Sequence, residues 1–182
     1  KTLCPIMLNV IFSILELYTM LIKIKKNGLL IFGNYKFRCA LGKAGTKKNK
    51  KEGDKATPRG IFTLGKIYYR SDRIKKIETS LKVRKIRKNM GWCHDPKNSE
   101  YNREINLNLI KEGENLFRRD HKYDLFIEIN YNSNPVIPNK GSAIFLHLTK
   151  NFEPTAGCIA INLKDFLILA KLIKPKTKIK IK

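Results

Sequence analysis

The chain has 182 residues and a mass of 21.1 kDa, a length that favours one domain with a hydrophobic core of its own. Hydrophobic residues make up 42% of the sequence, which excludes a disordered polycation even though 38 Lys and Arg against 15 Asp and Glu give a net charge of +23. The four cysteines form no Cys-x-x-Cys pair, which argues against a zinc ribbon and against a dense disulfide scaffold.

The beginning of the chain is ambiguous. Residues 3–22 are largely apolar but include a proline, an asparagine and a glutamate, and they lack a small-residue cleavage site. Three interpretations stay open: an export or anchoring segment that associates with a membrane, an extra amphipathic helix, and a non-native leader with Met20 as the initiator. We therefore assign residues 1–20 to a leader, anchor or extra helix, and residues 21–182 to the folded domain.

Alternating segments flanked by turn residues predict β-strands through most of the chain. Leu21–Lys25 and Leu29–Phe32 flank the turn pair Asn27-Gly28, a pattern typical of a β-hairpin. Further strands are expected at residues 35–41, 61–68, 123–131 and 142–148, with a loop at 42–55 and either a loop or a broken helix at 70–89.

One helix is well signalled near the end of the chain. Asn162 stands in an N-cap position, and Phe166–Ile173 carry an apolar helical face that ends at Lys174-Pro175. Residues 177–182 alternate with period two and predict a last strand at a sheet edge, where lysine limits further pairing. The expected fold class is mainly β, with few helices.

The segment that carries chemistry runs from His147 to Ala160. His147 ends an apolar strand, and Cys158 stands eleven positions later, so a returning loop can bring imidazole and thiol together. A free thiol, with a pKa of about 8.5, is mostly protonated at neutral pH, and a neighbouring histidine can activate it. The backbone N–H groups of Gly157 and Cys158 are candidate donors to an oxyanion. On spacing alone, a buried core cysteine beside a strand-end histidine remains the alternative.

These residues and several further segments in the same order resemble the L,D-transpeptidase catalytic domain family (YkuD type). In that family a histidine precedes a Ser/Thr-x-Gly-Cys element by roughly this spacing. The similar segments are Cys39–Gly45, Glu52–Gly60, Tyr69–Arg73, Trp92–Pro96, Tyr101-Asn102, Tyr123–Leu125, Tyr131-Asn132 and Gly141–Phe145. The resemblance covers about residues 29 to 181 and implies a bent β-sandwich with the late helix packed on the sheet.

The resemblance also implies acyl transfer on peptidoglycan stem peptides, with no metal or organic cofactor. Cys158 is then the nucleophile that attacks the carbonyl before the terminal D-alanine, His147 the general base and acid, and Gly157 a backbone donor to the oxyanion. An amine acceptor gives a 3→3 cross-link, whereas water gives L,D-carboxypeptidase or amidase activity. The substrate class predicts a periplasmic or cell-envelope protein of a bacterium, or a cytoplasmic one if the chain starts at Met20, and we expect a monomer.

One position departs from the family pattern. Many members carry arginine two residues after the cysteine, where this chain has Ala160. A guanidinium elsewhere would then bind the substrate carboxylate, because it can hold a carboxylate with two hydrogen bonds. The expected substrate-binding residues are Arg59, Arg73, Thr155 and Trp92, with Arg70 as a further arginine candidate.

The net charge of +23 predicts acidic partners but does not choose among nucleic acid, an anionic membrane and a wall polymer. A lysine-, isoleucine- and asparagine-rich composition is also typical of an AT-rich coding sequence. The basic clusters are not interleaved with aromatic residues, so we expect no nucleic-acid partner, and a basic nucleic-acid-binding protein stays the alternative. His94 lies beside Cys93 and Asp95 without a second ligand cluster, so no metal site is expected, although a redox role for Cys93 stays open.

Overall fold

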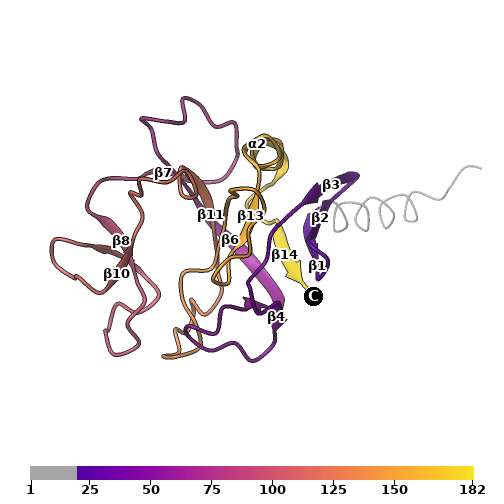
Figure 1. Ribbon diagram of the computed structural model, residues 1–182. Helices are drawn as coiled ribbons and strands as arrows, with labels where there is room; N and C mark the ends of the chain where they lie inside the picture. Colours follow the sequence, from indigo (N-terminus) through magenta and orange to yellow (C-terminus); the bar gives the residue numbers. More distant parts are fainter. Residues whose placement is uncertain (1–19) are drawn as a thin grey trace, which may run out of the picture.

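A large curved sheet organises the fold, as the computed structural model, which describes residues 20–182, shows (Figure 1). The expectation of a leader, anchor or extra helix at residues 1–20 lies, except for Met20, outside the described residues. In the described part of the chain, the sheet has the strand order β13-β12-β11-β6-β14-β1-β2-β3, with β7 paired to β6. Its strands are β1 (Leu21–Lys25), β2 (Leu29–Phe32), β3 (Tyr35–Arg38), β6 (Gly60–Tyr69), β7 (Val83–Lys85), β11 (Leu125–Ile129), β12 (Phe145–Leu148), β13 (Ile159–Ile161) and β14 (Lys178–Ile181).

Two small sheets and one helix complete the described part of the chain. A three-stranded sheet, in the order β10-β8-β9, lies to the left of the large sheet in Figure 1. The remaining elements are β4 (Thr46–Lys47), β5 (Thr57–Pro58), β8 (Met90–Cys93), β9 (Glu104–Asn106), β10 (Gly113–Asn115) and α2 (Leu163–Leu172). The mainly β fold class with one late helix is therefore confirmed for residues 20–182.

The predicted hairpin is present, and the geometry of its turn requires glycine at position 28. β1 and β2 pair antiparallel, with Lys25 opposite Leu29. Gly28 has a φ of +75°, and a Cβ there would lie 2.6 Å from the carbonyl oxygen of Cys39, so a larger residue would be both strained and crowded.

The prediction that the last strand lies at a sheet edge is wrong. β14 pairs in parallel with β1, with Leu21 opposite Lys178, and antiparallel with β6, with Thr63 opposite Lys178. Ile179 and Ile181 are buried on the core face, while the alternating lysines lie on the more accessible face. The alternation of apolar and polar residues along a strand indicates that one face is buried. It does not indicate whether both edges of the strand are paired.

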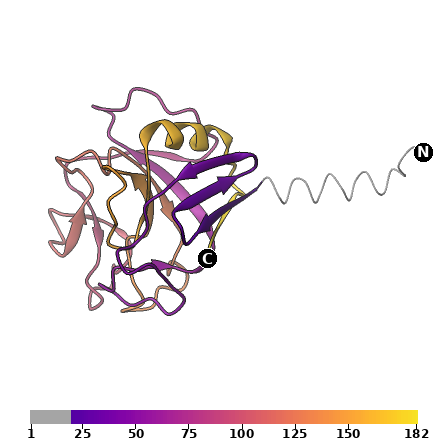
Figure 2. The ribbon, with the colours of Figure 1, turned by 45° about the vertical axis from the view of Figure 1, so that its right-hand side comes forward.

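The two faces of the large sheet bury different side chains. The helix α2 lies against the large sheet (Figure 2). It packs Phe166, Leu169 and Ala170 into an aliphatic core shared with Leu146 and Ile161. No helix within residues 20–182 is long and apolar enough to cross a membrane.

On the other face, aromatic residues fill the space between the large sheet and the three-stranded sheet. Phe126, Phe145, Tyr68 and Trp92 belong to this aromatic cluster, which also includes Cys158. Because side chains alternate along a strand, Phe145 and His147 of β12 share the aromatic face, while Leu146 and Leu148 face the aliphatic core.

The stretch at residues 70–89, expected to be a loop or a broken helix, is a loop that contains only the short strand β7. Arg70 anchors the beginning of this loop, because its guanidinium donates to Asp72 and to the carbonyl oxygen of Arg118. The loop therefore gains its order from side-chain hydrogen bonds as well as from packing.

Replacing the helix N-cap, Asn162→Ala, should lower the free energy of unfolding by about 1 kcal/mol, the usual cost of losing such a cap. The Asn162 side chain accepts the backbone N–H of Asp165 at 2.8 Å, and alanine leaves that donor without this acceptor. Urea unfolding measures the change. The exposed Lys164→Ala is the matched control, and an equal loss for both variants would contradict a specific capping role.

Candidate active site

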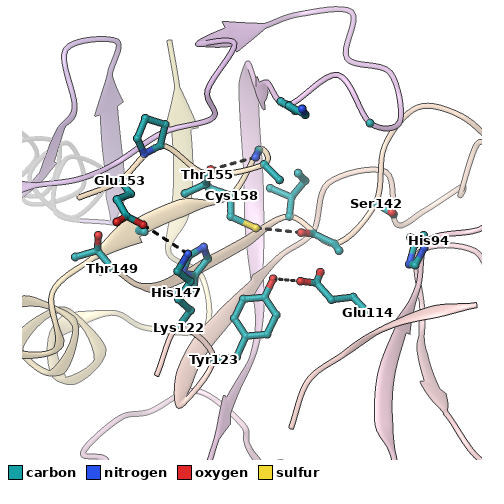
Figure 3. A pocket seen from close by; sticks show the side chains of 18 of the residues that line it. His94, Glu114, Lys122, Tyr123, Ser142, His147, Thr149, Glu153, Thr155 and Cys158 are labelled. Carbon is teal, nitrogen blue, oxygen red and sulfur yellow. Dashed lines mark hydrogen bonds and ion pairs between the residues drawn. The ribbon is translucent and has the colours of Figure 1, made fainter. Parts of the chain in front are cut away.

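The register of two neighbouring parallel strands places the cysteine beside the histidine strand. β12 and β13 pair with Leu146 opposite Ile159 and His147 opposite Ala160. Cys158, one residue before β13, therefore lies beside Phe145, whose backbone N–H donates to the Cys158 sulfur at 3.3 Å. Both Cys158 and His147 line one cavity of about 600 Å³. The structure thus brings together the two residues that the spacing suggested (Figure 3).

Cys158 is held as a neutral thiol. Its Sγ donates to the carbonyl oxygen of Ala143 at 3.1 Å, which requires the proton to be on sulfur. Burial raises the pKa of the Cys158 thiol to about 12, and the negative charge of Glu114 adds to that rise. The N–H of Phe145 and the ammonium of Lys50 lower the pKa by smaller amounts.

His147 is also neutral and has a fixed tautomer. Its Nδ1 lies 2.8 Å from the carbonyl oxygen of Leu148, and since a carbonyl can only accept, Nδ1 carries the hydrogen. Burial lowers the pKa of His147 to about 4, so that Nε2 is an unprotonated base at neutral pH. The Leu148 carbonyl is thus the group that orients the imidazole, an element that the sequence alone did not identify.

The loop that carries Cys158 is held by two threonines. Thr155 Oγ1 donates to the carbonyl oxygen of Cys158 at 2.6 Å and accepts the N–H of Gly157 at 3.1 Å. Thr57 Oγ1 donates to the same Cys158 carbonyl oxygen at 3.4 Å. Gly157 has a φ of +143°, and a Cβ there would lie 2.9 Å from the carbonyl oxygen of Ala56, so glycine is needed at this position.

These contacts bear on two expected roles. Thr155 lines the cavity, but its hydroxyl is used inside the loop to position the Cys158 backbone. The N–H of Gly157 donates to Thr155, so its expected donation to an oxyanion requires that bond to open or to be shared, and the role stays a prediction.

The other expected substrate-binding residues do not line this cavity. The Arg73 guanidinium pairs with Asp124 at 2.7 Å, and the Trp92 indole N–H donates to Asn102 at 2.9 Å inside the protein. Arg59 is exposed and Arg70 is engaged with Asp72, also away from the cavity. The cationic residues that do line it are Lys50, Lys55, Arg118, Lys122 and Lys150.

Lys50 is the lining residue that sequence reasoning missed most clearly. Its side chain is only 3% exposed, and its ammonium donates to Asp54 at 2.7 Å and to the carbonyl oxygen of Lys51 at 3.3 Å. The ammonium would lie 3.5 Å from a Cβ built on Gly157, beside the loop that carries Cys158. Within a run of lysines the sequence offers no signal that distinguishes this one, because its side chain packs against Gly141, which is distant in the sequence.

The pKa of Cys158 should be visible in its alkylation. Because the thiol pKa is raised to about 12, the thiolate is the minor form at pH 7 to 9, and its amount grows about tenfold with each pH unit there. We expect the rate of iodoacetamide reaction at the Cys158 peptide, followed by mass spectrometry of wild-type protein, to rise with that slope. A plateau below pH 8 would mean a pre-formed thiolate and would contradict the neutral pair.

Comparison with known proteins gives the family. The model of the family described as YkuD, the L,D-transpeptidase catalytic domain, matches residues 14–181. No curated protein and no solved structure matches the chain. Since the family match covers nearly the whole chain, the protein belongs to the L,D-transpeptidase catalytic domain family, whose members act on peptidoglycan stem peptides.

Within residues 20–182, no group of three or more His, Cys, Asp and Glu side chains is placed to hold a metal ion.

Proposed function

We propose that this chain is a cysteine-dependent acyltransferase that removes the terminal D-alanine of a peptidoglycan stem tetrapeptide and transfers the acyl group to an amine, forming a 3→3 cross-link. The observation that carries the proposal is the pair of a neutral Cys158 thiol and a neutral His147 imidazole on the wall of one cavity. Membership of the family supports the reaction class and the substrate class.

In the first half-reaction, proton transfer and attack occur together. His147 Nε2 removes the thiol proton as the Cys158 sulfur bonds to the carbonyl carbon, because a separated thiolate and imidazolium are costly in a buried site. When the tetrahedral intermediate collapses, the C–N bond breaks and the imidazolium returns its proton to the leaving amine of D-alanine. The product is a thioester on Cys158 and a neutral imidazole.

In the second half-reaction, the roles run in reverse. An acceptor amine attacks the thioester carbonyl and gives a proton to His147 Nε2. The C–S bond then breaks, and the imidazolium returns the proton to the Cys158 sulfur. Water in place of the amine gives a free carboxylate, so the same two side chains also support carboxypeptidase activity.

The charge of the cavity suits a substrate that carries carboxylates. Five basic residues and three acidic ones line it, so the net balance is positive. Lys50 lies beside Gly157 and adds positive charge there, but its ammonium is already paired with Asp54, as the Arg73 guanidinium is with Asp124. With this substrate, we propose that the protein works in the periplasm or cell envelope as a monomer and has no nucleic-acid partner.

The test is product analysis after incubation with disaccharide tetrapeptide. Wild-type protein should release D-alanine and form a cross-linked dimer, and Cys158→Ala should lower D-alanine release by more than about a thousandfold because the covalent intermediate cannot form. Mass spectrometry of the products measures both.

The matched control is Cys39→Ala, which removes a buried thiol that does not line the cavity. This variant should keep its turnover if it folds. Release of D-alanine without dimer would assign the carboxypeptidase reaction, and no turnover by folded wild-type protein would refute the proposed acyl transfer.

A further inference from the structure

A tyrosine from a different part of the chain lies against both reacting side chains. Tyr123, two residues before β11, is 6% exposed and lines the active-site cavity. Its ring meets the His147 imidazole edge-on, with the ring centres 5.4 Å apart and the planes at 68°. Figure 3 shows the side chains of Cys158, His147 and Tyr123 gathered in one part of the cavity.

The Tyr123 hydroxyl is held by a partly buried carboxylate. It donates to Glu114 Oε1 at 2.8 Å, and Glu114 belongs to β10 of the three-stranded sheet. The Arg118 guanidinium lies 3.4 Å from the same oxygen of Glu114. The packing of the small sheet against the large one therefore brings a carboxylate up to the tyrosine that faces the nucleophile.

Tyr123 and Cys158 line the same cavity and belong to the same buried cluster. The nearby Tyr123 hydroxyl lowers the pKa of the Cys158 thiol, against the larger opposing effects of burial and of the Glu114 charge. Burial, together with the charges of Cys158 and Glu114, raises the pKa of Tyr123 well above its usual value. The phenol therefore stays protonated at neutral pH.

A phenol has one hydrogen to give and therefore cannot serve both acceptors fully. In the resting site the sulfur is a thiol that donates to Ala143, and the hydroxyl donates to Glu114. When His147 removes the thiol proton, the sulfur becomes a charged acceptor and competes for the same hydrogen. A hydrogen bond to a charged acceptor is stronger than one to a neutral thiol, so the thiolate, unlike the resting thiol, can share the hydroxyl hydrogen with the Glu114 carboxylate.

We propose that Tyr123 is a third catalytic side chain, whose hydroxyl donates a hydrogen bond to the Cys158 sulfur as the thiolate develops, and that Glu114 is the positioning residue that holds this hydroxyl. The proposal rests on the proposed acyl transfer. No bond to Tyr123 forms or breaks, since only the direction of its O–H changes. The charged and titratable groups around Glu114 are Tyr123, Arg118, His94 and Asp120.

Alkylation of Cys158 by iodoacetamide tests the proposal without any peptidoglycan substrate. At pH 8, Tyr123→Phe should lower the rate at the Cys158 peptide by about tenfold, because the thiolate loses a hydrogen bond while the ring packing is kept. Glu114→Gln should raise the rate, because the opposing charge is removed and the hydroxyl is released toward sulfur. A purely structural role predicts no such opposite effects.

The matched control is Tyr68→Phe. Tyr68 is 1% exposed, belongs to the same aromatic cluster and donates to a carboxylate, Glu104, at 2.9 Å, but it does not line the cavity. Loss of the Tyr68 hydroxyl should leave the alkylation rate at Cys158 within about twofold of the wild-type rate, as expected for a hydroxyl outside the cavity. Equal rates for Tyr123→Phe and Tyr68→Phe would overturn the catalytic role of Tyr123.

The double variant tests whether Glu114 acts through the tyrosine. In the Tyr123→Phe background, Glu114→Gln should raise the alkylation rate by a smaller factor than in wild type, whereas equal factors would overturn the positioning role. If Tyr123→Phe does not fold, the same measurement is made with Tyr123→Leu, and an alkylation rate unchanged from wild type refutes the proposal. Since alkylation needs no acyl transfer, an inactive wild type with these shifts would refute the proposed function and leave the contact of Tyr123 with sulfur standing.

Discussion

The parallel pairing of β12 with β13 is the constraint on which the active site depends. His147 lies within β12, and Cys158 enters β13, so the register between the two strands sets the distance between imidazole and thiol. A slip of one residue would turn His147 from the aromatic face toward the aliphatic core. That core, which includes Leu146 and Leu148 from the same strand, therefore fixes the chemistry as well as the stability.

Burial of the pair has a cost and a use. Because the site disfavours separated charges, both groups are mostly neutral at rest. In the proposed reaction, the thiolate develops as the substrate carbonyl is attacked. The protein offsets this cost with fixed donors and charges around the sulfur: the Phe145 N–H, the Lys50 ammonium and, in our proposal, the Tyr123 hydroxyl. Such groups are oriented before the reaction, which is the condition for effective electrostatic stabilisation.

Local features of the fold could be predicted from the sequence, and long-range ones could not. The hairpin turn at Gly28 and the N-cap at Asn162 depend on a few neighbouring residues, and both are confirmed. The edge position of the last strand was wrong, because pairing of β14 with β1 joins the two ends of the described chain. For residues 70–89 the sequence could not decide between a loop and a broken helix. The beginning of this stretch is held by a long-range contact, from Arg70 to the Arg118 carbonyl oxygen.

The candidate site divides in the same way. The thiol and imidazole could be named because Cys158 follows His147 by eleven positions within a motif that resembles the family's. Glu114 and Lys50 reach the cavity through the packing of distant segments, and no local pattern marks them among many charged residues. Arg73 looked suited to a substrate carboxylate, but Asp124 already occupies its guanidinium.

The most direct test of the central claim is the intact mass of the protein, quenched in acid soon after mixing with disaccharide tetrapeptide. We predict an increase equal to the substrate mass less D-alanine, located on the Cys158 peptide and absent from Cys158→Ala. Release of D-alanine by wild-type protein with no adduct on Cys158 at any mixing time, and with the same release by Cys158→Ala, would contradict a reaction through the Cys158 thioester.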